Sequence, residues 1–255
     1  MSGAGPGPSV VRVGCVESTQ AIAFALAADG AADRTVVFAD SQTAGRGRRG
    51  RAWVDEPGAS LLVSVLLRPK LEPARLPLLS LAVAVAVAEA LTAVAGVAAR
   101  LKWPNDVLVD GRKIAGILLE SRLGPFPVVV AGVGVNIDQR SFPKELHGRA
   151  TSVALETGRA VERQPLADAL LDRLEHWRRV LERGATVELL DRWRSLADTL
   201  GRTVTVDGAR GVAVDIDTDG ALMIADGARR HRVVAGEVAE SSPASSPIGS
   251  PCPSG

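Results

Sequence analysis

Aromatic side chains are scarce in this chain of 255 residues, which has four Phe, four Trp and no Tyr. Proteins that bind single-stranded nucleic acid stack bases on such rings, so the sequence is poorly equipped for that function. An excess of charge of one sign is also lacking, since the formal net charge is +1. Binding of a polyanion through bulk charge is therefore disfavoured, although a local basic cluster stays open.

Cysteine and histidine are rare as well. Cys15 and Cys252 lie near opposite ends of the chain, which disfavours a disulfide framework or a structural zinc site. The three histidines, His147, His176 and His231, show no metal-ligand spacing. No basic segment followed by an apolar run opens the sequence, so we expect no signal peptide and a reduced, cytoplasmic protein.

One long hydrophobic run stands out, over residues 76–99. It carries Glu89, and its charge-free part, 76–88, is too short to span a bilayer. We therefore predict a buried core helix and no membrane contact.

The composition divides the chain into four parts. Residues 1–9 and 241–255 are rich in Gly, Pro and Ser, and we expect both to be disordered. Between them we expect a main domain over residues 10–200. Short apolar strands with Gly and Asp turns over 201–240 are typical of a small β-barrel.

Hydrophobic periodicity predicts the other elements. Ser18 or Thr19 suits the N-cap of an Ala-rich helix that runs through Ala28. Apolar residues recur at helical spacing over 164–183 and 187–200. The predicted strands, apart from one hairpin, are residues 36–39, 60–67, 128–137, 203–206, 211–216, 221–224 and 231–234.

The hairpin is predicted over residues 107–120, where the Asp-Gly pair at 110–111 supplies the positive φ values of a type I′ turn. Lys113 follows this turn, and strand alternation would place it on one face with Ala115 and Ile117. A lysine among small and apolar neighbours is well placed to project into a cleft, although a solvated strand lysine is the alternative.

A glycine- and arginine-rich segment occupies residues 45–51 (GRGRRGR). Glycine allows close backbone approach to a ligand, and the arginine fork matches carboxylate and phosphate oxygens. Such a loop would be mobile when empty and would close over an anionic ligand. It is not a P-loop, since no Gly-Lys-Ser/Thr ending is present. The alternative is a basic patch that binds nucleic acid.

A second polar segment, residues 102–106 (KWPND), sets a cation, an amide and a carboxylate beside a proline bend. Asn105 could bind a polar ligand, and Asp106 could lie near Mg²⁺ or a phosphate. A plain strand-to-hairpin corner is the alternative, and Trp103 is expected to pack. Asn136, at the end of an apolar strand, needs a partner if it is buried.

In this order, four segments of the chain resemble the biotin protein ligase family: residues 42–53 (QTAGRGRRGRAW), 102–106 (KWPND), 112–120 (RKIAGILLE) and 132–136 (GVGVN). Residues 17–19 (EST) resemble the first biotin-contacting segment of that family. The resemblance implies an α+β catalytic domain related to class II aminoacyl-tRNA synthetases and lipoate ligases, followed by an SH3-like C-terminal domain.

The implied reaction has two steps. Biotin reacts with MgATP to give biotinyl-5′-AMP, and a lysine of a biotin carboxyl carrier domain then takes the biotinyl group. Lys113 and Arg48 would be the catalytic residues, and Asp106 would hold magnesium. Biotin contacts would fall on Ser18, Thr19, Gln20, Gln42, Arg46, Gly47, Arg48, Lys113 and Gly116. Contacts with ATP and the adenylate would fall on Gly45, Arg46, Arg48, Arg49, Arg51, Trp53, Lys102, Asn105, Lys113 and Asn136.

Two departures from the family pattern matter. Gln20 stands where the family has Asn, and only 16 residues precede Glu17. The second departure leaves no room there for a winged helix-turn-helix, so we expect a monofunctional ligase that does not bind an operator. Three alternatives stay open: a lipoate–protein ligase, a nucleic-acid-binding regulator, and a catalytically dead biotin-binding or scaffold protein.

Overall fold

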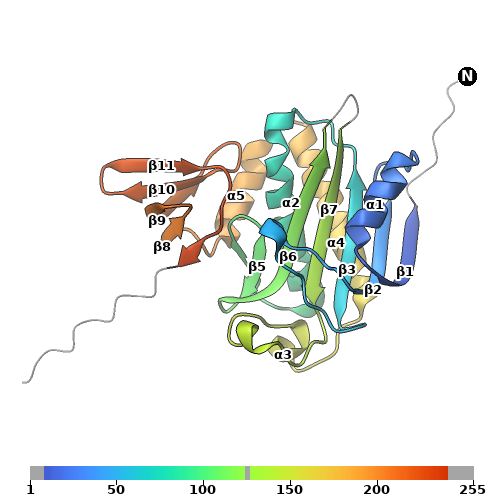
Figure 1. Cartoon of the computed structure of the whole chain (residues 1–255). Coiled ribbons are helices and arrows are strands. Elements are labelled where there is room, and N and C mark those ends of the chain that lie inside the picture. Colours follow the sequence, from blue (N-terminus) through green and yellow to red (C-terminus); the bar gives the residue numbers. More distant parts are fainter. Residues whose placement is uncertain (1–8, 124–126, 241–255) are drawn as a thin grey trace, which may run out of the picture.

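The structure, a computed structural model, describes residues 9–123 and 127–240. The tail 241–255 with Cys252, and residues 1–8 of the predicted disordered N-terminus, lie outside the described residues. The described chain forms a large mixed sheet with helices on both faces and a second, smaller antiparallel sheet beside it (Figure 1).

The large sheet has the strand order β1-β2-β3-β7-β6-β5-β4. β1 runs parallel to β2, and the other neighbouring strands are antiparallel. Its strands are β1 (Val10–Val16), β2 (Val36–Gln42), β3 (Ser60–Leu67), β4 (Arg100–Lys102), β5 (Asp106–Val109), β6 (Arg112–Arg122) and β7 (Val128–Asn136). β3 and β7 confirm the predicted buried strands, and their apolar sequences follow from cover on both faces. β1 and β4 were not predicted, because one is a largely exposed edge strand and the other has three residues.

α1 (Thr19–Ala28) covers one face of this sheet near β2 and β3. The hydroxyl of Ser18 caps it by accepting a hydrogen bond from the Gln20 amide, which confirms Ser18 rather than Thr19 as N-cap. Ala23 and Phe24 of this helix pack on the sheet in a small cluster of their own. The rest of this face, beyond the N-terminus of α1, is left for the cavity described below.

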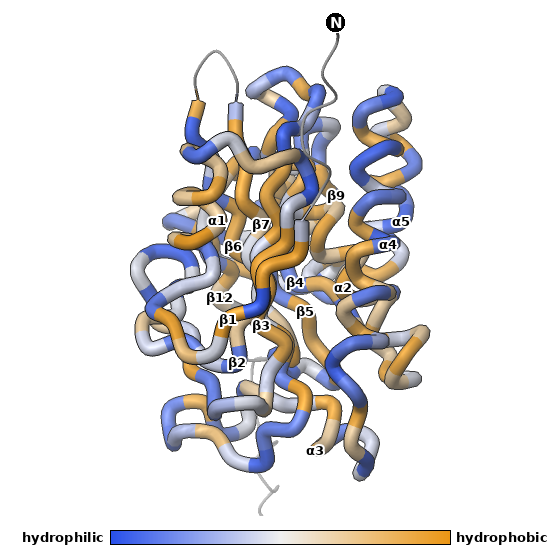
Figure 2. The backbone as a smooth tube through the Cα atoms, turned by 90° about the vertical axis from the view of Figure 1, so that its right-hand side faces the viewer, coloured by the Kyte–Doolittle hydropathy of each residue, from blue (hydrophilic) through white to orange (hydrophobic). Residues whose placement is uncertain are grey.

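α2 (Pro77–Ala95), α4 (Arg163–Glu182) and α5 (Thr186–Leu196) pack on the opposite face (Figure 1). α2 is long and apolar enough to pass for a membrane span, but most of it is buried as the core helix of this layer. α4 and α5 carry hydrophilic residues on their outer sides, whereas the strands are mainly hydrophobic (Figure 2). The remaining short helices are η1 (Arg48–Gly50), η2 (Pro73–Arg75), η3 (Lys144–Leu146) and α3 (Val153–Thr157).

Two predicted helix ends were wrong. The core helix stops at Ala95, four residues before the predicted end, because Gly96 adopts a left-handed φ of 72° and caps it. α5 stops at Leu196 instead of Leu200, because Ala197 is extended and forms a bridge with Leu101 of β4. Tertiary pairing thus overrides the helical periodicity there.

The second sheet has the strand order β11-β10-β9-β8-β12. Its strands are β8 (Thr203–Val206), β9 (Ala209–Ile216), β10 (Leu222–Asp226), β11 (Arg229–Val233) and β12 (Ala239–Glu240). β8 to β11 confirm the predicted strands to within two residues. Trp103 of the KWPND segment donates from Nε1 to the carbonyl of Gly220, 3.0 Å away in the turn between β9 and β10. The two sheets therefore meet at that segment.

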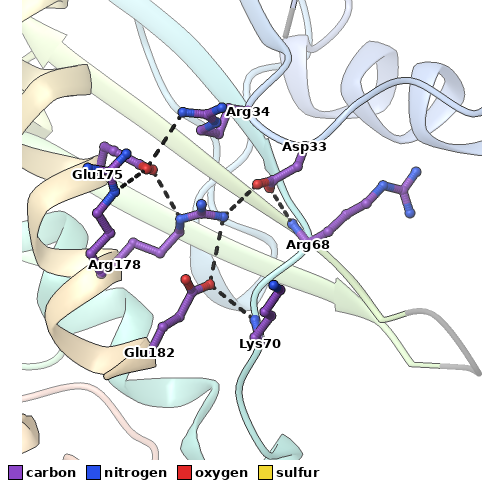
Figure 3. Close-up of polar contacts among 8 residues, drawn as sticks. Asp33, Arg34, Arg68, Lys70, Glu175, Arg178 and Glu182 are labelled. Carbon is purple, nitrogen blue, oxygen red and sulfur yellow. Dashed lines mark hydrogen bonds and ion pairs between the residues drawn. The ribbon is translucent and has the colours of Figure 1, made fainter. Parts of the chain in front are cut away.

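A buried arginine ties α4 to the loops of the sheet (Figure 3). Arg178 is 8% exposed, and its Nη1 lies 2.7 Å from Asp33 Oδ2 and 3.8 Å from Glu182 Oε1. The same two carboxylates accept hydrogen bonds from the backbone amides of Arg68 and Lys70. This network fixes the layer of α4 against the sheet far from the cavity.

Candidate active site

The face of the sheet beside α1 carries a cavity of about 630 Å³. Every predicted site residue except Gly45 lines it. These residues come from the start of α1, the end of β2, the loop of residues 45–53 (the arginine loop), the KWPND corner, β6 and β7. Segments that are up to 118 positions apart, from Ser18 to Asn136, are thereby brought to one place.

Three glycines make the floor of the cavity. Gly116 of β6 pairs directly with Gly134 of β7, and Gly132 pairs with Ser64 of β3. In the segment GVGVN the glycines face the cavity, whereas the intervening valines belong to the core on the other face. A Cβ atom at Gly134 would come within 2.5 Å of the Trp53 ring. Glycine is therefore required here because the arginine loop lies against the sheet.

The end of the cavity near α1 is lined by hydroxyl and amide groups. The Oε1 atom of Gln42 accepts hydrogen bonds from the Thr19 amide at 2.8 Å and from its hydroxyl at 3.2 Å. Gln20 is 4% exposed and donates from Nε2 to the Leu118 carbonyl at 3.3 Å. Its Oε1 atom lies where a Cβ at Gly132 would come within 2.4 Å. The longer side chain of Gln20 thus fits because the residue beneath it, Gly132 of β7, has no side chain.

The arginine loop is a tight, folded-back segment in this structure. Arg46 forms an antiparallel bridge with Ala52, and the Gly47 amide donates to the Arg51 carbonyl at 2.7 Å. The chain turns at Arg49, which has a left-handed φ of 55°. Arg46 pairs with Glu120 at 2.9 Å. The loop has a defined conformation in this structure, and its mobility in solution stays a prediction.

Arg48 points from the loop to the KWPND corner. Its Nη1 atom donates to Asn105 Oδ1 and to the Gly236 carbonyl, both at 3.3 Å. Burial, together with the nearby positive charge of Arg49, lowers the pKa of the Arg48 guanidinium from its usual value. The group stays cationic at neutral pH, because an arginine pKa starts far above that range.

Gly45 is the predicted contact that the structure does not bring to the cavity. Its carbonyl accepts a hydrogen bond from the Trp53 amide at 2.9 Å, and a Cβ atom on it would lie 2.9 Å from the Trp53 carbonyl. Glycine is needed at this position because the backbone of Trp53 packs closely against it, and not because a ligand does. Trp53 itself lines the cavity, and its Nε1 donor is buried without a hydrogen-bond partner in the described structure.

Lys113 forms an ion pair with Asp106, with 2.6 Å between Nζ and Oδ1. The predicted face of Lys113 was wrong, because a β-bulge shifts the register between β5 and β6. Leu108 is opposite Lys113 and Val107 is opposite Ala115, so alternation is broken between them. Lys113 therefore extends over Gly116, where a Cβ atom would lie 3.1 Å from Nζ. The bulge aims the lysine into the cavity.

Asn136 is buried and has a hydrogen-bond partner, as expected from the sequence if this residue were buried. It is 4% exposed, and its Nδ2 donates to the Thr151 carbonyl at 2.9 Å. Its Oδ1 atom is buried without a partner among the described residues, although the side chain lines the cavity. An unsatisfied acceptor at a cavity wall is suited to receive a ligand donor.

Sequence reasoning missed two walls of the cavity. One is the segment after β7, which contributes Phe142, Leu146 and Arg149. The other is residues 236–239, which follow β11 and include the first residue of β12. Neither segment has a periodic hydrophobic pattern or a recognisable motif, so its place at the cavity depends on the tertiary fold alone.

The donor set for a divalent cation is small. Within residues 9–123 and 127–240, no group of three or more His, Cys, Asp or Glu side chains is arranged so that it could hold a metal ion. Asp106 supplies one carboxylate beside Asn105 at the cavity. Mg²⁺ bound with a nucleotide is usually held by one or two carboxylates and by phosphate oxygens. The residues present therefore fit magnesium that arrives with ATP and do not form a site for a metal alone.

Comparison with known proteins agrees with this geometry. The biotin/lipoate A/B protein ligase family matches residues 13–137 of this chain. The biotin–acetyl-CoA-carboxylase ligase of Paracoccus denitrificans is 38% identical over 234 residues, which cover 87% of this chain and 96% of that protein. The Mycobacterium tuberculosis ligase of the same name is 41% identical, over 87% of this chain and 85% of that protein.

A solved structure extends the match to the fold. The biotin protein ligase from Aquifex aeolicus in complex with biotin and ATP superposes with a TM-score of 0.81 at 29% identity. The superposition covers 91% of this chain and 99% of that one. This chain belongs to the biotin/lipoate A/B protein ligase family and, within it, to the biotin protein ligases.

Proposed function

We propose that this chain activates biotin with ATP and transfers the biotinyl group to a lysine of a biotin carboxyl carrier domain. The observation that carries the proposal is the single cavity that holds Lys113, Arg48 and Asn136 together with the polar residues at the start of α1. Relatives named as biotin–acetyl-CoA-carboxylase ligases support this acid and this class of acceptor.

In the first step a carboxylate oxygen of biotin attacks the α-phosphorus of ATP. The bond between the α-phosphorus and the bridging oxygen breaks, so biotinyl-5′-AMP forms and pyrophosphate leaves. Both reactants are anions, and fixed positive charge is needed to hold them together. Lys113 and Arg48 would supply this charge, since both line the cavity beside the KWPND corner, where Lys113 contacts Asp106 and Arg48 contacts Asn105.

In the second step the neutral ε-amine of the acceptor lysine attacks the acyl carbon of the adenylate. An amide bond forms, the bond from the acyl carbon to the phosphate oxygen breaks, and AMP leaves with the electron pair while the amine loses a proton. The arginine loop and Trp53 would cover the adenylate and keep water away from it.

The residue roles follow the shape of the cavity. Ser18, Thr19, Gln20 and Gln42 would bind the polar ring of biotin, with Arg46, Gly47 and Gly116 around its chain. Asn105, Asn136 and Lys102 would contact ATP, and Asp106 would hold the magnesium that neutralises phosphate charge. Arg49, Arg51 and Trp53 line the same cavity, but Gly45 is better assigned to the shape of the loop.

The domain organisation and the cellular location can be proposed on the same basis. We propose that residues 10–200 are the catalytic domain, of a type related to class II aminoacyl-tRNA synthetases. Residues 201–240 would be an SH3-like domain, and the enzyme would act in the cytoplasm. Specific DNA binding is not expected, because the net charge of +1 provides little attraction for a duplex.

The test is mass spectrometry of a biotin carboxyl carrier domain after incubation with this protein, MgATP and an equimolar mixture of biotin and lipoate. We expect addition of a biotinyl group, and its loss in the variant Lys113→Ala. Addition of a lipoyl group instead would keep the chemistry and overturn the acid. No addition to a carrier that a known ligase can modify would refute the proposed function.

A further inference from the structure

Three arginines of the loop lie within four residues, and their charges repel one another. The charges of Arg49 and Arg51 both lower the pKa of Arg48. In the structure, however, each of these two neighbours is paired with a carboxylate. Arg49 lies 2.8 Å from Asp207, and Arg51 lies 2.7 Å from Glu237. Arg48 is the one of the three that turns inward, to Asn105.

Both carboxylates come from the second sheet, more than 150 residues away in sequence. Asp207 and Gly208 form the turn between β8 and β9, with φ values of 46° and 88°. Two consecutive residues with positive φ are typical of a two-residue hairpin turn. Such a short turn holds the Asp207 carboxylate in a fixed position. Both Asp207 oxygens accept hydrogen bonds from Nη2 of Arg49, each at 2.8 Å.

Glu237 belongs to the segment that leads into β12, and this segment makes a second contact with the loop. The carbonyl of Gly236 accepts a hydrogen bond from Arg48 itself. Gly236, Glu237 and Val238 also line the cavity. The second sheet therefore meets the loop at two points, the turn between β8 and β9 and the segment that leads into β12.

We propose that Asp207 and Glu237 are positioning residues for the adenylation step. They neutralise Arg49 and Arg51 and hold the loop over the cavity, so that Arg48 keeps its charge directed at the reacting anions. The proposal rests on the proposed function and gives Arg49 and Arg51 a role other than the predicted contact with ATP. It also assigns the second sheet a part in the active site.

The two ion pairs are half exposed, with side-chain exposures of 51% and 49% in one and 56% and 47% in the other. Exposed pairs of this kind contribute little to global stability. The double variant Asp207→Asn/Glu237→Gln should therefore unfold within a few degrees of the wild-type temperature. Its kcat/KM for ATP in biotin-dependent pyrophosphate exchange should fall about 2- to 30-fold, the range expected for two such pairs.

A double-mutant cycle between Arg49 and Asp207 separates positioning from direct contact. We expect Arg49→Gln and Asp207→Asn to lower kcat/KM by the same factor, and the double variant to be no worse than either. If Arg49 instead binds the phosphates of ATP, Arg49→Gln will cost much more than Asp207→Asn. Removing Asp207 would then free the arginine and lower KM for ATP. Either result would overturn the proposal.

Asp226→Asn is the control, because it removes one negative charge, as Asp207→Asn does, from an exposed residue of the same sheet. It should leave exchange unchanged. Amide hydrogen exchange of residues 46–53, measured without ligands, gives a second readout that does not depend on catalysis. Protection should drop in Asp207→Asn/Glu237→Gln and not in Asp226→Asn. Equal protection in both would refute the positioning role even if the wild-type protein failed to activate biotin.

Discussion

At the scale of single residues, Lys113 is the most direct test of the chemistry. It lies between Asp106 and Gly116 and extends into the cavity because of the bulge in the hairpin. Removal of one preorganised charge of this kind typically lowers the rate about 10²- to 10³-fold. Lys113→Ala should show a loss of at least this size in pyrophosphate exchange. Near-normal turnover in this variant would remove Lys113 from the mechanism.

Gly134 tests whether the glycine floor is needed for the loop. A Cβ atom there would lie 2.5 Å from the Trp53 ring, so Gly134→Ala has to displace Trp53 from the sheet. Because small misplacements of an active site can cost about 10²-fold in rate, we expect a 10- to 100-fold lower kcat/KM. Gly14→Ala is the control, since a Cβ atom at Gly14 has nothing within 4 Å. Equal activity of the two variants would contradict this assignment.

Asp55 makes stability depend on pH. Burial raises the pKa of the Asp55 carboxyl, whose Oδ1 is buried without a partner in the described structure. As pH rises, the unfolded chain loses this proton before the folded one does, so the free energy of unfolding falls between the two pKa values. Asp55→Asn should therefore be more stable than wild type at pH 7. Urea titrations across pH 4–8 should show this gain shrink at the acid end, and a pH-independent gain would contradict the cause.

At the scale of elements, the attachment of α4 depends on Arg178. Loss of one partner from a buried ion pair costs about 3–5 kcal/mol, because the remaining charges stay without compensation. The carboxylate partners here keep some solvent contact, with 32% exposure at Asp33 and 19% at Glu182. We therefore expect about 3 kcal/mol for Arg178→Ala, measured by urea unfolding.

Arg179 offers a matched control for this prediction. It is the next residue on the same helix and also pairs with Glu175, but its side chain is 67% exposed. Exposed pairs of this type contribute at most about 1 kcal/mol. Arg179→Ala should therefore destabilise the protein far less than Arg178→Ala. A similar cost for both would show that the buried network is not what holds α4.

The helices and strands also show how much of the fold could be predicted from the sequence. Strands 60–67 and 128–137 and the helix over 164–183 were predicted nearly in place, because long apolar periods leave few alternatives. The Lys113 face was wrong because a bulge has no signal in a binary pattern. The cavity walls at 142–150 and 236–239 could not be predicted, since they become part of the site only through contacts between distant segments.

At the scale of the whole molecule, nearly all the residues that the motifs predicted as ligand contacts meet in one cavity. Motif residues are recognisable because each structural requirement selects a particular residue type. Close backbone approach and tight turns select glycine, and a permanent positive charge selects arginine. Asp207 and Glu237 had no such signal, since any carboxylate at the right place would pair with an exposed arginine. Contacts between the two sheets are therefore what the structure adds to the sequence.

The two sheets share one hydrophobic core, which includes Leu81 of α2 as well as Val204, Ile216 and Leu222 of the second sheet. Gly220 lies against Leu81, where an added Cβ would come within 3.1 Å of that side chain. Neither layer can lose its neighbour without exposing apolar surface to water. We therefore expect calorimetry to show one unfolding transition, with equal calorimetric and van't Hoff enthalpies.

Trp103→Phe probes this coupling and keeps an aromatic ring at the buried position, although the smaller ring also leaves a cavity. The variant removes the Nε1 donor and leaves the buried Gly220 carbonyl without its hydrogen bond, which costs about 1–3 kcal/mol. Because the core is shared, the whole transition should move to lower temperature and stay single. Two resolved transitions, in the wild type or in the variant, would instead mean that the second sheet unfolds alone and that its contacts with the arginine loop can open while the large sheet stays folded.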